Sequence, residues 1–216
     1  MRQISRLSVI AVTTALLITL SSCGSTQSTL EADDQPSTPI ENREMTTDVQ
    51  ENKANGDSPQ GSVTDAANFE ITENEDGTVT ISRYIGTETD IVIPSQISGK
   101  TVSAIGNVMG TTGAFEGCTN ITAVVIPKGV TEIQDNAFYG CTSLETVTIP
   151  SSVTLLRNCA FCDCPNLRAV YFKGDAPQQA NYVFDSTENV TMYYQDGTSG
   201  WENPWHGRPA EVYIPE

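Results

Sequence analysis

Six cysteines are the residues of this chain whose chemistry and spacing stand out. Five lie in its C-terminal half, at Cys118, Cys141, Cys159, Cys162 and Cys164. The first, second and last of these recur every 23 residues, which favours small apolar side chains stacked in a repeated bend. Cys159, Cys162 and Cys164 could instead offer three thiolates to a metal, but zinc usually takes four ligands. We expect no metal and no cofactor, and a disulfide involving Cys159 or Cys162 is the alternative in an exported chain.

Catalytic chemistry finds little support in the sequence. A hydrolase needs a nucleophile beside an oriented base. The only histidine, His206, lies between Trp205 and Gly207 in NPWHGRP, where a capping role is expected. Two carboxylates could suffice for a glycosidase, but the acidic residues show no motif and a narrow repeat stack leaves no obvious cleft. We therefore predict no catalytic residues and no enzymatic activity.

Three segments repeat one pattern: AFEGCTNITAVVIP at 114–127, AFYGCTSLETVTIP at 137–150 and AFCDCPNLRAVYFK at 160–173. Each unit contains an apolar L-x-x-V-x-I segment, a turn, a second short apolar pair and an AF-x-x-C bend. A fixed period of this length is the signature of a solenoid. No unit can bury its own apolar face, so stacked units must share one continuous core.

Weaker copies extend the stack in both directions. The segment 91–106 carries the same apolar order upstream; downstream, Phe184 falls in the phenylalanine column and VTMYY at 190–194 begins in the leucine column. The expected fold is a mainly β repeat solenoid, a short stack of about five parallel strands. Residues 69–84 predict an N-terminal hairpin cap turning near Asp76-Gly77. Trp201, Pro204 and Trp205 predict an irregular aromatic C-terminal cap.

Counting outward from the buried columns places one residue of each strand in a row on the opposite face. These residues are Val92, Val125, Thr148, Tyr171 and Tyr194. A row of valines and tyrosines is typical of a contact surface, since a solvated sheet would favour polar residues. We take it as the candidate partner contact. The alternative is that the 201–205 segment or the 106–113 loop covers it.

The units resemble the BspA-like class of leucine-rich repeats of bacterial surface proteins. The resemblance covers about 70–216 and rests on the AFxGC bend, the IP turn, the opening DGTVTISRYIGTETDIVIP and the closing FKGDAP, YYQDGTSGW and GRP segments. It implies a right-handed solenoid on the cell surface, in proteins associated with adhesion to host or matrix proteins and with contact between bacteria.

The N-terminal sequence is typical of an export signal. Two arginines in MRQISR precede the apolar run LSVIAVTTALLITL, which is shorter than the about 20 residues that span a bilayer. The following Leu20-Ser21-Ser22-Cys23 resembles the lipobox of bacterial lipoproteins, in which the cysteine is lipidated. We therefore expect a signal peptide at 1–22, a lipid anchor on Cys23, and an exported chain attached to the cell membrane or outer membrane.

Residues 23–67 are poor in large apolar side chains and hold nine acidic residues against two basic ones, which predicts a disordered acidic tether. The remaining 68–216 is of the usual size for one repeat domain. The net charge of −16 and the lack of a basic patch argue against a nucleic-acid partner. The expected function is an anchored, adhesin-like binding module for a protein or glycan. The alternative is a structural component of the envelope that self-associates or contacts other lipoproteins.

Overall fold

The computed structural model describes residues 61–106, 112–179 and 182–214. The expected signal peptide, Cys23 and nearly all of the expected tether lie outside these residues. Within the described ranges, no helix has the length and apolar character needed to cross a membrane.

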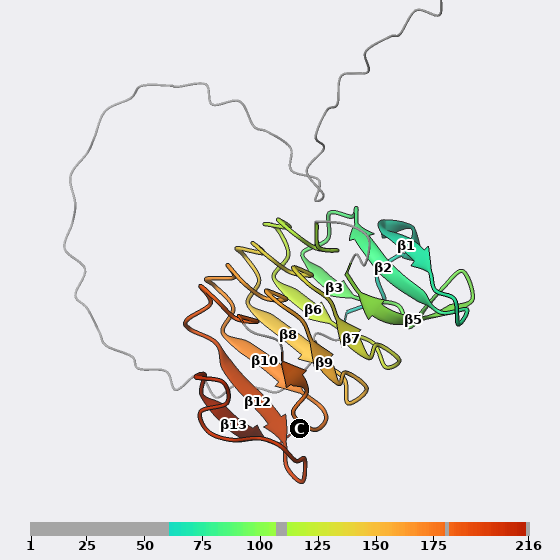
Figure 1. The fold of residues 1–216 in the computed structure, drawn as a ribbon. Helices are drawn as coiled ribbons and strands as arrows, with labels where there is room; N and C mark the ends of the chain where they lie inside the picture. The colour runs from blue at the N-terminus through green and yellow to red at the C-terminus, as the bar shows by residue number, and fades with distance from the viewer. Residues whose placement is uncertain (1–60, 107–111, 180–181, 215–216) are drawn as a thin grey trace, which may run out of the picture.

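Two β-sheets form the walls of a stack of coils, each coil giving one strand to each sheet (Figure 1). The first sheet has six strands in the order β13-β12-β10-β8-β6-β3, all parallel. They are β3 (Asp90–Val92), β6 (Ala123–Val125), β8 (Thr146–Ile149), β10 (Ala169–Phe172), β12 (Thr191–Gln195) and β13 (Ala210–Tyr213). Five of them are the rungs that the repeats predict, and β13 adds a sixth after the aromatic cap.

The second sheet has seven strands, of which those in the middle come from the shorter apolar pair of the repeats. They are β1 (Phe69–Glu73), β2 (Val79–Tyr84), β4 (Gln96–Ile97), β5 (Lys100–Ile105), β7 (Glu132–Ile133), β9 (Leu155–Leu156) and β11 (Gln178–Gln179). The main path is β1-β2-β5-β7-β9-β11, and β4 pairs with β5 beside it. This sheet ends at β11, whereas the six-stranded sheet continues with β12 and β13.

The core lies between the sheets and consists of the predicted columns. Val124, Val147 and Val170 are register partners on successive strands, and each is at most 1% exposed. Ile133 and Leu156 form the corresponding column of the second sheet and are fully buried. Parallel strands about 4.8 Å apart bring like residues of adjacent coils into contact, so a repeated sequence produces a continuous core.

The AF-x-x-C bends close the coils at one edge, and their phenylalanines stack face to face. Ring centroids are 4.8 Å apart between Phe115 and Phe138, 5.1 Å between Phe138 and Phe161, and 5.5 Å between Phe161 and Phe184. Gly117 and Gly140 turn two of these bends with φ near +70°, a conformation that glycine adopts without strain. The predicted phenylalanine column is therefore confirmed.

The in-register cysteines are buried thiols that bridge neighbouring coils. The Sγ of Cys141 donates to the carbonyl of Phe115, and that of Cys164 to the carbonyl of Phe138, both at 3.1 Å. Thr187 replaces the cysteine in the next coil and donates to the carbonyl of Phe161 at 2.7 Å. Burial raises the pKa of the Cys141 thiol, so this side chain stays a neutral donor.

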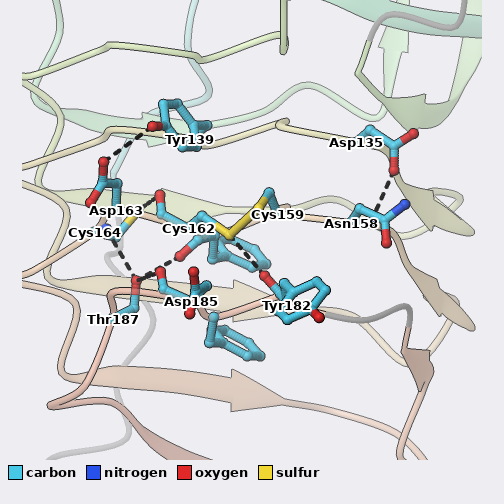
Figure 2. The surroundings of a disulfide bond; sticks show 12 residues. Asp135, Tyr139, Asn158, Cys159, Cys162, Asp163, Cys164, Tyr182, Asp185 and Thr187 are labelled. Carbon is cyan, nitrogen blue, oxygen red and sulfur yellow. Dashed lines mark hydrogen bonds between the residues drawn. A yellow bond between two sulfur atoms is a disulfide. The ribbon is translucent and has the colours of Figure 1, made fainter.

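Cys159 and Cys162 form a disulfide within a single bend, as Figure 2 shows. This pairing resolves the alternative that the sequence left open. The coil below brings the backbone of Tyr182 next to the bridge, with its carbonyl oxygen 2.8 Å from the Sγ of Cys162. Among the described residues, no group of three or more histidine, cysteine or acidic side chains is arranged to hold a metal ion.

The N-terminal cap is the predicted hairpin, in which β1 and β2 pair antiparallel and Gly77 occupies the turn with φ +82°. The chain before it already contacts the repeat domain, with a short 3-10 helix η1 (Ala66–Asn68). The amide of Thr64 donates to the carbonyl of Val92 at 2.9 Å, and the Val92 amide donates to the hydroxyl of Thr64 at 3.1 Å. These bonds occupy the outer edge of β3, so ordered packing starts before residue 68.

Candidate functional site

The candidate surface is the outer row of the six-stranded sheet, and pairing of the strands fixes its members. Val92 pairs with Val125, Val125 with Thr148, and Thr148 with Tyr171. The next register partner of Tyr171 is Tyr193. The outer row, as used below, is therefore Val92, Val125, Thr148, Tyr171 and Tyr193.

The assignment of Tyr194 to this row is wrong. Tyr194 pairs with the buried Phe172 and so belongs to an inner column, where it stacks on Trp201 with ring centroids 5.0 Å apart. From Phe161 to Val170 the chain advances nine residues, but from Phe184 to Met192, the register partner of Val170, it advances only eight. The connection into β12 is one residue shorter, and a shift by one residue turns each side chain to the opposite face of a strand.

Three tyrosines gather at the C-terminal end of the outer row. The rings of Tyr171 and Tyr193 stack with centroids 5.2 Å apart, and Tyr213 meets Tyr171 edge-on at 5.4 Å. This set, Tyr171, Tyr193 and Tyr213, is called the tyrosine cluster below. Burial raises the pKa of Tyr171, and the phenols of Tyr193 and Tyr213 raise it further. Its hydroxyl therefore remains protonated and can both donate and accept a hydrogen bond.

Exposure differs along the row. Val92, Val125, Tyr171 and Tyr193 are half-buried, whereas Thr148 in the middle is only 3% exposed. At the N-terminal end, Val92 is close to Gly61, where an added Cβ would lie 3.3 Å from its Cγ2. The accessible aromatic part of the row is thus Tyr171 and Tyr193, and the buried Tyr213 packs edge-on against Tyr171.

The aromatic cap covers the end of the core. Trp201 and Trp205 contact Phe172 with ring centroids 4.8 and 5.6 Å apart, and Trp205 is 4% exposed. Phe172 faces inward, so these contacts lie on the opposite side of β10 from Tyr171. Residues 107–111 of the second proposed cover lie outside the described residues.

Two members of the tyrosine cluster, Tyr193 and Tyr213, are not among the residues that the sequence pattern predicts for this surface. Tyr193 follows from the alternation of Thr191, Met192 and Tyr193 once Met192 is aligned with the valine column. Tyr213 lies on β13, a strand that carries no copy of the repeat motif, and no signal in the repeat pattern points to it. His206, the residue with the best prospects for catalysis, lies exposed in a tight turn between Trp205 and Arg208.

Comparison with known proteins supports the repeat assignment. The family model of the BspA type leucine-rich repeat region matches residues 100–198, in six copies. This model describes a repeat and does not indicate a catalytic family. No curated protein matches the chain.

Among solved structures, the leucine-rich repeat protein of T. pallidum is 22% identical, with a TM-score of 0.52, and the match covers 72% of this chain and 84% of that one. A leucine-rich cell surface protein of Faecalibacterium prausnitzii A2-165 is 29% identical with a TM-score of 0.49, over 74% of this chain and 44% of that protein. The first of these likenesses shows the fold. Together with the repeat match, it establishes that the chain carries a BspA-type leucine-rich repeat region, in a mainly β solenoid.

Proposed function

We propose that this chain is a cell-surface binding module, anchored by lipid on Cys23 and engaging a protein or glycan through the outer row of its six-stranded sheet. The observation that carries the proposal is the tyrosine cluster. Aromatic residues supply a disproportionate share of interface energy, and tyrosine combines a large apolar ring with a polar end. An export signal and an acidic tether suit a domain displayed away from the membrane.

The test is binding by cells that display the full chain. Surfaces are coated with purified host matrix proteins (fibronectin, collagen, laminin) or with an array of glycans, and the bound cells are counted. Tyr171→Ala should weaken the productive interaction by about 1–3 kcal/mol, or roughly 5- to 150-fold in Kd. Tyr139→Ala is the matched control, because Tyr139 is 38% exposed on a bend and lies away from the outer row.

The comparison requires that the wild type, Tyr171→Ala and Tyr139→Ala are displayed on cells at equal levels, which an antibody to the chain measures. Loss of adhesion in Tyr171→Ala but not in Tyr139→Ala supports the binding module. If no coated surface retains the wild type, or if Tyr171→Ala adheres as well as the wild type, this function is wrong.

A structural role in the envelope is the second candidate, and strand β13 is the observation that favours it. In the described residues β13 pairs with β12 on one side alone, and Val212 and Ile214 are 50% and 82% exposed. Unpaired strand edges are templates for pairing with another chain. Sedimentation of the purified full chain over a range of concentrations separates the two functions: a dimer that Val212→Lys abolishes supports assembly, and a monomer at all concentrations rejects it.

A further inference from the structure

A second candidate site lies where the seven-stranded sheet ends, away from the outer row. There a pocket of about 370 Å³ opens beyond β11. Its polar lining comes from Gln179 on β11, Tyr182 and Asp185 on the following bend, and His206 and Arg208 from the C-terminal cap. Its volume is near the lower end of the roughly 300–1,000 Å³ typical of small-molecule sites.

Gln179 is a polar residue at a position where the neighbouring coils have apolar ones. It pairs with Leu156, which pairs with Ile133, so it continues a fully buried apolar column of the second sheet. Its Nε2 is buried and has no hydrogen-bond partner among the residues that the structure describes. A buried donor without an acceptor destabilises the fold, and such groups in native proteins call for an explanation. A rotation of the Gln179 side chain toward the pocket would bring this donor to an oxygen of a bound molecule.

The C-terminal cap completes the lining of the pocket and holds its side chains in fixed positions. Trp205 and Arg208 exchange backbone hydrogen bonds of 2.9 and 3.0 Å, which close a two-residue turn at His206 and Gly207. His206 has φ +48° in this turn, a conformation that is uncommon for a residue other than glycine. One guanidinium nitrogen of Arg208 donates to the carbonyl of Phe184 at 3.0 Å. Among the described residues, neither Arg208 nor Asp185 forms an ion pair within 4 Å.

The chemistry of these groups selects the ligand. Gln179 and Arg208 are donors and Asp185 is an acceptor, so the lining complements hydroxyl groups, which donate and accept at once. The chain carries a net charge of −16, which disfavours an anionic ligand. Tyr182 is 72% exposed at the pocket, where its ring can stack on an apolar face. We propose that this pocket binds one sugar unit of a neutral saccharide, and that the Gln179 side chain rotates on binding so that its amide donates to a hydroxyl oxygen of the sugar.

The test uses the purified full chain and the methyl glycosides of glucose, galactose, mannose and N-acetylglucosamine. Binding is measured by saturation-transfer NMR and titration, with glucuronic acid as the charged comparison. At least one glycoside should bind. Gln179→Leu should weaken it about tenfold or more while the Tm stays equal or rises, because leucine restores the apolar column. Tyr182→Ala should also weaken binding. Because Tyr182 lies exposed at the entrance of the pocket, its loss should not disturb the packing of the core.

Matched controls separate this site from the proposed function. Gln178→Ala changes the neighbouring residue outside the pocket, and Tyr171→Ala changes the tyrosine cluster; both should bind the glycoside like the wild type. The proposal is overturned if none of the four glycosides binds, if glucuronic acid binds more tightly than all of them, or if Gln179→Leu and Tyr182→Ala both leave binding unchanged. None of these outcomes bears on adhesion through Tyr171.

Discussion

The Cys159–Cys162 disulfide occupies positions that the preceding bend fills with Asn136 and Tyr139. Asn136 and Cys159 both adopt left-handed backbone, with φ +56° and +52°. Asparagine tolerates this conformation better than cysteine. The same bend also has Asp163, with φ +57°, where the preceding one has Gly140. The third repeat thus places two less suitable residues in its bend, and the covalent bridge offsets this by closing the turn.

Removal of the bridge should therefore destabilise the domain. For the double variant Cys159→Ser/Cys162→Ser, loop-closure entropy of a four-residue loop gives a loss of about 2 kcal/mol. In a domain of this size the Tm should fall by roughly 4–8 °C, measurable by circular dichroism. Reductant should lower the Tm of the wild type by a similar amount and leave the variant unaffected. Coincident melting curves of the variant and the oxidised wild type would show that the bridge is dispensable.

At the scale of the elements, the phenylalanine stack holds successive coils together. Phe138 lies in the middle of this stack and is fully buried between Phe115 and Phe161. Phe138→Ala should cost about 3–5 kcal/mol, because it removes a large side chain and leaves a cavity. The Tm should fall by roughly 6–20 °C in thermal melts. Tyr139→Ala, on the exposed side of the same bend, should change stability by less than about 0.5 kcal/mol. Equal melting of the two variants would contradict the inward placement of Phe138.

Repetition explains why the coils could be predicted and where prediction stopped. Three near-identical copies identify each buried column, because one side chain must occupy the same place in every coil. The fourth copy loses one residue before β12, yet Val190 is 1% exposed, as the leucine column requires. The apolar pattern as far as Val190 therefore shows no shift, and only the alignment of Met192 with the valine column indicates that Tyr193 rather than Tyr194 faces outward. Tyr213 and the pocket at Gln179 arise where the repeat ends, so periodicity carries no information about them.

At the scale of the whole molecule, the two ends of the stack differ. The N-terminal end is closed by the β1–β2 hairpin and by Thr64 along β3. At the C-terminal end the six-stranded sheet extends past β11, and the pocket opens beyond β11. The tyrosine cluster lies separately, on the outer face of the six-stranded sheet. Both candidate sites thus lie toward the end of the domain farthest along the chain from Cys23. This arrangement suits a module that presents its C-terminal end to a partner.

In the proposed function, that end is presented by a chain that is anchored through Cys23. Cys23 follows the apolar run after two serines, and two or more acyl chains give durable membrane attachment where one is marginal. Cells fed a clickable fatty-acid analogue should label the wild type and not Cys23→Ser, and the variant should move from the membrane fraction to the soluble or secreted fraction. Cys118→Ser serves as the matched control, since that cysteine is buried in the repeat core and its loss should not affect labelling. Label retained by Cys23→Ser would contradict the anchor, and the surface function would then need another means of attachment.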